Sequence, residues 1–133
     1  MRKCCVSDCS LNVLPVFLCH DIVALLLMSP KRIGFVGFDG AAALNLVGPA
    51  DALSTAALND GYGNRISCYE VCTIGLSSKS FQSESGIVFN PQETLGTAPE
   101  LDTIVIPGGK GLRRPDINEA ISDWILTLSL IHI

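Results

Sequence analysis

The sequence has 133 residues, 48% of them hydrophobic, and a formal net charge of −4. This is enough apolar content to bury the core of one domain or of part of one. The acidic balance excludes the basic surface expected of a nucleic-acid-binding domain. If the protein acts on DNA, a segment outside this sequence must bind it.

Residues 1–30 are interpreted as an extension of doubtful origin. The segment has a basic start followed by apolar residues, but Pro15, His20 and Asp21 interrupt the apolar run. No small-residue cleavage site follows, so neither a signal peptide nor a membrane span is predicted. We expect a cytoplasmic protein without membrane contact. An alternative interpretation is that Met28 is the natural start, because "MSPKRIGFVGF" reads as a short polar lead into a first strand; residues 1–27 would then be upstream sequence translated by mistake.

The cysteine pattern indicates neither a metal site nor a disulfide framework. Four of the six cysteines lie in the first twenty residues, and Cys68 and Cys72 lie in a strand-like run. The spacings match neither paired zinc ligands nor a small secreted scaffold. Cys68 and Cys72 are predicted to be buried thiols on one face of a strand. No bound metal or cofactor is expected.

The first elements predict a buried strand followed by a helix. Arg32–Phe38 is a continuous apolar run, typical of a central strand covered on both faces. Asp39 and Gly40 form the turn, and Asp39 is placed to cap the helix. Residues 59–64, "NDGYGN", end that helix. Its buried stripe is predicted to contain Leu46, Ala50, Leu53 and Ala57.

The middle of the chain predicts a strand, a hairpin and a short helix. The second strand covers Ile66–Ile74, and the hairpin turns near Ser83–Gly86. In "NPQETL", Asn90 has the chemistry of a helix cap, with Pro91 at the first helical position and Glu93 at the third.

Thr103–Ile106 is a further buried strand, and it leads directly into "PGGKG". A helix follows, and one side of it carries Ile117, Ile121, Trp124 and Ile125. Alternating strands and helices predict an α/β fold with a parallel sheet and helices on both faces. Ligands of such sheets bind beyond the carboxyl ends of the strands, where Asp39–Gly40 and Gly108–Gly111 are expected.

The glycine turn is the strongest local signal. Closely spaced glycines after a buried strand let backbone N–H groups face a ligand or a developing oxyanion. The turn is not a Walker loop. In that motif the first glycine stands five positions before the Gly-Lys pair and Ser or Thr follows the lysine, whereas here Gly111 and Leu112 follow Lys110. A plain tight turn is the alternative interpretation. Nearby cationic side chains either attract an anion or form a solvated loop face: Lys110, Arg113 and Arg114.

No catalytic residue is assigned. His20 and His132 are the two histidines, and both lie in terminal segments, so a Cys–His or Ser–His pair has no base in the core of the chain. The strand-to-helix turn that exposes a nucleophilic Ser or Cys is also missing from the sequence.

The order of "RIGFVGFDG", "LNLVGPADAL", "SGIVFNPQETL" and "LDTIVIPGGKG" resembles the first half of a PfpI-like domain. This family, which includes the parkinsonism-associated deglycase, belongs to the class I glutamine-amidotransferase-like superfamily. The greatest likeness is to the amino-terminal sensor domain of AraC-type transcription regulators, with the isonitrile hydratases as near relatives. The resemblance covers about residues 31–125, a partial flavodoxin-like domain, and residues 126–133 are interpreted as a tail foreign to the family.

The resemblance implies a site around Asn45. In the family, an Asp or Glu four residues before the helix proline bonds the nucleophilic cysteine, and the "PGG" turn lies beside that cysteine. Here that position holds Asn45, which cannot act as a general acid or base but can bond a ligand. Pro49 removes the helix bond to the Asn45 carbonyl, so a kink is expected. Alternatively, Asn45 only satisfies its own helix backbone.

The resemblance therefore predicts binding of a small effector by Asn45, Gly108, Gly109, Asp39 and Gly40, without catalysis. The family's cysteine would lie beyond the helix that contains Trp124, and the DNA-binding helices would follow it. The expected function is an effector-sensing fragment of an AraC-type regulator, dimeric when intact and bound to DNA through a missing domain. The alternatives are a truncated cysteine-dependent hydratase or hydrolase, and a non-functional fragment. We also expect poor solubility, because an incomplete sheet leaves an apolar edge.

Overall fold

The computed structural model describes residues 29–59 and 62–131, so nearly all of the predicted extension lies outside the described residues. The cysteines and histidine of that extension, and His132, lie outside them too. In chain order the elements are β1 (Lys31–Gly37), α2 (Ala43–Thr55), β2 (Ala57–Asn59), β3 (Arg65–Ser67), β4 (Tyr69–Gly75), β5 (Phe81–Gln82), β6 (Val88–Phe89), β7 (Glu93–Thr94), β8 (Thr103–Val105), the 3-10 helix η1 (Lys110–Arg113) and α3 (Pro115–Ile131).

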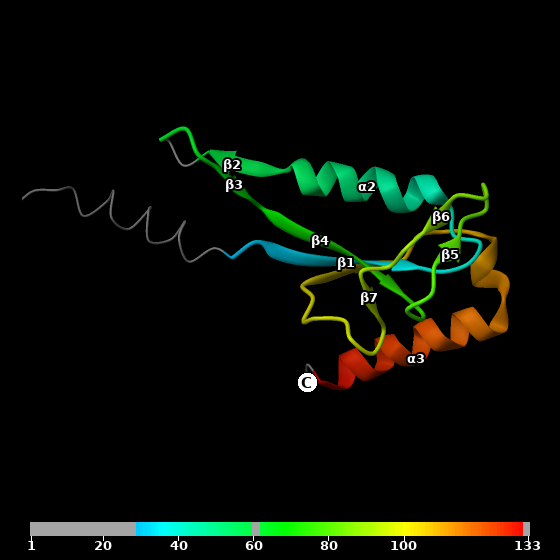
Figure 1. Ribbon diagram of the computed structural model, residues 1–133. Coiled ribbons are helices and arrows are strands. Elements are labelled where there is room, and N and C mark those ends of the chain that lie inside the picture. Colours follow the sequence, from blue (N-terminus) through cyan, green and yellow to red (C-terminus); the bar gives the residue numbers. More distant parts are fainter. Residues whose placement is uncertain (1–28, 60–61, 132–133) are drawn as a thin grey trace, which may run out of the picture.

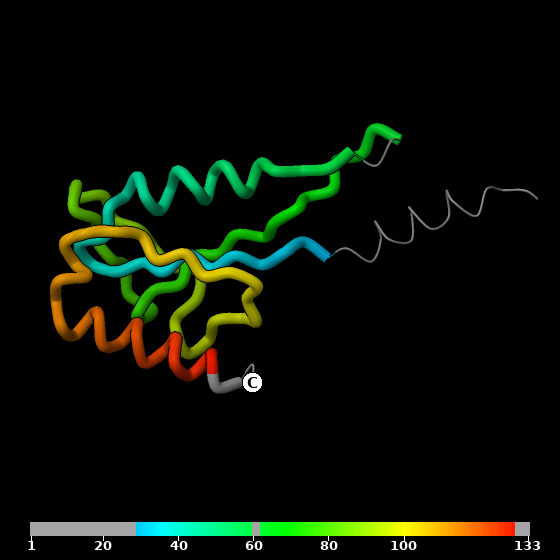
Figure 2. The backbone as a smooth tube through the Cα atoms, turned by 180° about the vertical axis from the view of Figure 1, so that it is seen from behind, coloured from blue at the N-terminus to red at the C-terminus, as the bar shows by residue number. Residues whose placement is uncertain are grey.

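A four-stranded sheet forms the centre of the fold, in the order β7-β4-β1-β8. All three of its strand pairs are parallel. Helix α2 covers one face and α3 covers the other (Figures 1 and 2). The predicted α/β fold is confirmed, and β1 is the internal strand that its apolar sequence indicated. β8 is the outer strand on its side of the sheet.

Side chains from β1 and α3 make the larger part of the core. Val36 and Phe38 are almost fully buried and cluster with Ile117 and Ile121 of α3. Trp124 packs against this cluster, whereas Ile125 is 37% exposed and does not pack against it. The stripe predicted for this helix is therefore correct for its first three members. The helix also continues past residue 125 to Ile131.

Helix α2 differs from the prediction at both ends. It ends at Thr55, because residues 57–59 form β2 and pair with β3 in an antiparallel hairpin, so Ala57 is not part of the helical stripe. At its start the cap residue is Ala42, which provides no side-chain hydrogen bond. Asp39 does not cap the helix, since its carboxylate is bound by a distant segment described below. Pro49 lies inside α2, which remains one continuous helix (Figure 1).

The helix predicted from "NPQETL" does not form. Residues 93–94 are strand β7, which pairs in parallel with β4. The side-chain oxygen of Gln92 accepts a hydrogen bond from the Thr73 N–H at 2.8 Å, and the Gln92 N–H donates to the Thr73 carbonyl at 3.0 Å. Pairing with the sheet edge thus gives the Gln92 backbone N–H the hydrogen-bond partner that a helix cap would otherwise have provided.

The hairpin prediction is confirmed. β5 and β6 pair antiparallel, and the Gly86 N–H donates to the Ser83 carbonyl at 3.0 Å in the turn between them. The rings of Phe81 and Phe89 stack across the pair with centroids 5.4 Å apart. In the part of the chain that the structure describes, no helix is both long and apolar enough to cross a bilayer.

Candidate functional site

Two loops cross each other at the carboxyl ends of β1 and β8. Ala41 and Gly109 form an isolated antiparallel bridge. The Ala42 N–H donates to the Gly108 carbonyl at 2.8 Å, and the Gly111 N–H donates to the Gly40 carbonyl at 3.1 Å. The sequence-predicted juxtaposition of residues 39–42 with the glycine turn is therefore present in the structure.

The crossing explains why the turn is rich in glycine. A Cβ atom on Gly109 would lie 2.3 Å from the Gly40 carbonyl oxygen, and the φ angle of Gly109 is 155°. A Cβ on Gly40, whose φ is 78°, would lie 2.8 Å from the Gly111 nitrogen. Both obstacles are backbone atoms, which cannot swing away as a flexible side chain would. These glycines allow the two loops to touch.

The β5–β6 hairpin forms hydrogen bonds with both of the crossing loops. The Gln82 N–H donates to Asp39 Oδ1 at 2.8 Å, and the Gly40 N–H donates to the Gln82 carbonyl at 2.7 Å. Glu84 makes two contacts, because its N–H donates to the Ala41 carbonyl at 2.9 Å and its carboxylate accepts from the Lys110 N–H. Glu84 was not singled out from the sequence, since no local pattern connects a hairpin tip with a turn 26 residues away.

Asn45, Gly108 and Gly109, which we call the Asn45 corner, lie beside this crossing. A Cβ on Gly108 would lie 3.2 Å from Asn45 Nδ2, so the amide is directly against the turn. Within residues 29–59 and 62–131, neither the Asn45 side chain nor the N–H groups of Gly108 and Gly109 have a hydrogen-bond partner. The Asn45 amide therefore does not bond its own helix backbone. The corner presents unpaired donors and one unpaired amide oxygen at an exposed position.

The five residues predicted to bind a ligand thus fall into two groups. Asn45, Gly108 and Gly109 keep free polar groups, whereas the hairpin engages Asp39 Oδ1 and the N–H of Gly40. Asp39 remains exposed and lines a cavity of about 230 Å³ on the α3 side of β1. That cavity is also lined by Lys79, Arg114 and Asp116.

The cationic side chains near the turn are not equivalent. The guanidinium of Arg114 forms an ion pair with Asp116 at 2.7 Å. Asp116 hydrogen-bonds Arg114 and raises its pKa, and the same bond lowers the pKa of Asp116. Lys110 and Arg113 are exposed and take part in no ion pair within the described ranges.

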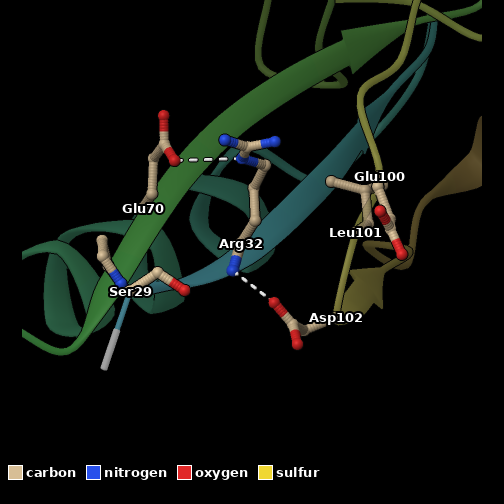
Figure 3. Close-up of a pocket in the computed structure, with 7 residues that line it drawn as sticks. Ser29, Arg32, Glu70, Glu100, Leu101 and Asp102 are labelled. Carbon is tan, nitrogen blue, oxygen red and sulfur yellow. Dashed lines mark hydrogen bonds and ion pairs between the residues drawn. The ribbon is translucent and has the colours of Figure 1, made fainter. Parts of the chain in front are cut away.

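A second cavity, of about 300 Å³, lies at the amino ends of the strands (Figure 3). The Arg32 Nε donates to Glu70 at 3.0 Å, and the Arg32 N–H donates to Asp102 Oδ2 at 2.8 Å. Lys31 pairs with the other oxygen of Asp102 at 2.7 Å. This end of the sheet is therefore lined by paired charges.

The described cysteines lie away from the Asn45 corner. Cys72 is opposite Gly34 in the middle of the β1–β4 pair, and Cys68 lies between β3 and β4. Burial, followed by the charge of Glu70, raises the pKa of the Cys72 thiol, which keeps it protonated at neutral pH. Both thiols are partly rather than fully buried, and Cys68 lies outside the strands, so the prediction of two buried thiols on one face of a strand is wrong. Among the described residues, no cluster of His, Cys, Asp and Glu side chains could hold a metal.

No family model and no curated protein matches the sequence. Solved structures do match. A ThiJ/PfpI family protein from Bacillus anthracis has a TM-score of 0.61 and 17% identity, over 75% of this chain and 46% of that chain. A ThiJ/PfpI family protein from Pseudomonas syringae has a TM-score of 0.54 and 22% identity, over 72% and 38%. An AraC family transcriptional regulator from Pseudomonas putida has a TM-score of 0.52 and 21% identity, over 74% and 60%.

The resemblance inferred from the sequence is confirmed at the level of the fold. The chain spans between 38% and 60% of the length of these three solved chains, so it corresponds to part of each of them. The described part of the chain has the α/β fold of the ThiJ/PfpI proteins, and it shares that fold with an AraC family regulator.

Proposed function

We propose that the Asn45 corner binds a small effector and that the chain is the sensing part of an AraC-type regulator. The observation that carries this proposal is the contact between the Asn45 side-chain amide and Gly108. Within the described residues, the Asn45 side chain and the Gly108 N–H have no hydrogen-bond partner, and only the Gly108 carbonyl is bonded. Unpaired donors on a rigid loop favour ligand binding, because the loop needs little reordering when the ligand arrives.

Binding is favoured over catalysis by the chemistry of the corner. An amide neither donates nor accepts a proton at neutral pH. Of the described thiols, Cys72 lies in the middle of the β1–β4 pair and Cys68 precedes β4, so neither lies at the carboxyl edge of the sheet. The Cys72 pKa is raised, which is the reverse of what a nucleophile needs. The corner therefore supplies recognition, and it supplies no general acid, general base or nucleophile.

The regulator context is supported by the AraC family neighbour and by the charge of the chain. A net charge of −4 does not suit a DNA-binding surface, so a separate segment would contact the operator. We place such a regulator in the cytoplasm and expect it to act as a homodimer, with the effector changing how the two subunits present their DNA-binding parts.

The experiment is a titration of the ¹⁵N-labelled chain with acetamide, acetone and acetate, followed by NMR. We expect at least one probe to shift the Gly108 and Gly109 amide signals and the Asn45 side-chain signals together. Asn45→Ala should abolish the response. Asn90→Ala is the matched control, because Asn90 is exposed and makes no hydrogen bond within the described ranges.

Two results would overturn the proposal. The first is a full titration in which none of the three probes moves the corner signals. The second is a response that persists unchanged in Asn45→Ala. A third measurement separates binding from catalysis: reproducible hydrolysis or hydration that survives blocking of the cysteines but is lost in Asn45→Ala would show that the corner is catalytic.

A further inference from the structure

The carboxylates around the Asn45 corner bear on the kind of ligand that fits there. Glu84 accepts from the N–H of Lys110, which is one peptide unit from Gly109. Asp39 accepts from the N–H of Gln82 within the same crossing of loops. Both carboxylates accept a backbone N–H, but Asp39 lines the cavity on the α3 side of β1, so Glu84 is the one bonded to the glycine turn itself.

The charge of Asp39 is partly offset by Arg114, whose pKa it helps to raise, whereas Glu84 forms no ion pair within the described residues. The guanidinium of Arg114 is also joined to Asp116 by two hydrogen bonds of 3.2 Å and 2.7 Å. Lys110 has an exposed side chain that forms no ion pair in the described part of the chain. A flexible, hydrated ammonium gives much weaker attraction than a fixed, desolvated one.

The Glu84 bond also removes a donor that an anion would use. Successive N–H groups of a glycine turn form an anion-binding nest when they all remain free. Here the Lys110 N–H is already bonded to a carboxylate, which leaves the N–H groups of Gly108 and Gly109. Two donors suffice for one neutral carbonyl oxygen, whereas a carboxylate would meet repulsion from Glu84.

From these contacts we infer that the Asn45 corner selects a neutral primary-amide or carbonyl group over a carboxylate, and that Glu84 is the specificity-determining residue. The ligand oxygen accepts from the turn, and a ligand amide N–H donates to Asn45 Oδ1. Glu84 does not touch the ligand. It acts by charge and by holding the turn. This inference rests on the proposed function, because it concerns the same corner.

Acetamide and acetate provide a matched pair of probes, since they have the same shape and differ in charge. For the unaltered chain at pH 7, we expect acetamide to bind roughly tenfold more tightly than acetate, as judged by the Gly108 and Gly109 amide shifts. Glu84→Gln retains an oxygen to accept from Lys110 and removes the charge. It should bring acetate affinity up to about that of acetamide, while acetamide affinity stays the same.

Two further variants complete the test. Glu119→Gln removes an exposed carboxylate of α3 that makes no ion pair or hydrogen bond within the described residues, and it should leave the preference unchanged. Glu84→Ala removes the bond to Lys110 as well as the charge, so it should weaken both probes and speed exchange of the Lys110 amide proton. A purely structural role for Glu84 would leave the affinities of both probes unchanged in Glu84→Gln and weaken both of them in Glu84→Ala.

The inference fails if acetate binds the unaltered chain as tightly as acetamide, or if Glu84→Gln leaves the preference unchanged. In either case the corner would still bind a probe, so the proposed function would stand. If neither probe shifts the corner signals, the proposed function fails first. The two failures are therefore distinguishable in one set of titrations.

Discussion

Both ends of the sheet carry charged side chains, but the contacts of these side chains differ. At the carboxyl end, the carboxylates of Asp39 and Glu84 accept from backbone N–H groups of other loops. At the amino end, the side chain of Arg32 pairs with Glu70 (Figure 3), and the side chain of Lys31 pairs with Asp102, on the protein surface. The carboxyl end is thus a network of backbone contacts, and the amino end is a set of exposed ion pairs.

This difference predicts which end of the sheet tolerates amino-acid substitutions without loss of stability. Exposed ion pairs contribute little to stability, because solvent screens them and two long side chains must be ordered. Backbone contacts between loops at close approach leave no room for an added atom. We therefore expect substitutions at the carboxyl end to destabilise the fold and those at the amino end to act weakly, mainly at extremes of pH.

Gly109→Ala should show the largest effect. Its Cβ would lie 2.3 Å from the Gly40 oxygen and 2.8 Å from Ala41 Cα, so the two loops would have to separate. We expect a loss of roughly 3 kcal/mol in the free energy of unfolding. Urea denaturation followed by the fluorescence of Trp124, the single tryptophan, measures it. Gly96→Ala is the control, because its Cβ would meet only Thr94 Oγ1 at 3.9 Å. Equal losses in both variants would contradict the interlocking of the loops.

Asp39→Ala comes next in expected size. It removes the acceptor of the Gln82 N–H and frees one side of the hairpin, at a cost of about 1 kcal/mol. Asp39→Asn should recover most of that loss, since its side-chain oxygen can still accept. Hydrogen exchange at the Gln82 amide would speed up in Asp39→Ala and return towards the original rate in Asp39→Asn. An unchanged Gln82 amide in Asp39→Ala would show that this bond contributes nothing.

Much of the sheet could be predicted from the sequence, because its signals are local. The apolar run of β1 has no polar alternation. The glycine at position 86 indicates the hairpin turn, and in the structure it has the positive φ, 86°, that such a turn favours. The order of the motifs was enough to indicate the fold. Asn45 and Gly108 could be placed together since both follow the carboxyl ends of strands that proved to be neighbours.

The errors came from contacts between distant segments. "NPQETL" has the capping pattern of a helix, but Gln92 pairs with Thr73 and the segment joins the sheet edge instead. Asp39 has the position of a cap, but the Gln82 N–H, 43 residues away, takes its carboxylate. Helix α2 ends early because Leu58 pairs with Ile66 across a hairpin. No local window contains these partners, and Glu84 was overlooked for the same reason.

Gly108→Ala tests the position of the Asn45 amide with only a small change in stability. A Cβ at 3.2 Å from Nδ2 is tight but displaces a side chain rather than backbone. The added methyl also restricts the unfolded chain, so the net change should stay within about 0.5 kcal/mol. The Asn45 side-chain NMR signals should shift clearly, while those of Asn118 on α3 should not. Unmoved Asn45 signals would place the amide away from Gly108.

The smallest effect is expected at the amino end and depends on pH. The bonds from Lys31 and from the Arg32 N–H lower the pKa of Asp102 below its usual 3.8, and Asp102 raises the pKa of Lys31 above 10.5. The contribution of ionised Asp102 to the stability of the fold is present above pH 3.8 and is lost as the pH falls through its lowered pKa. The Lys31 contribution to stability is present below pH 10.5 and is lost as the pH rises through its raised pKa.

Asp102→Asn should flatten both limbs of a plot of melting temperature against pH and leave the neutral region nearly unchanged. Asp51→Asn, an exposed carboxylate of α2 without an ion pair in the described ranges, should leave both limbs as they are. A large loss at pH 7 in Asp102→Asn would mean that the amino end also depends on specific contacts, and the contrast between the two ends would then disappear.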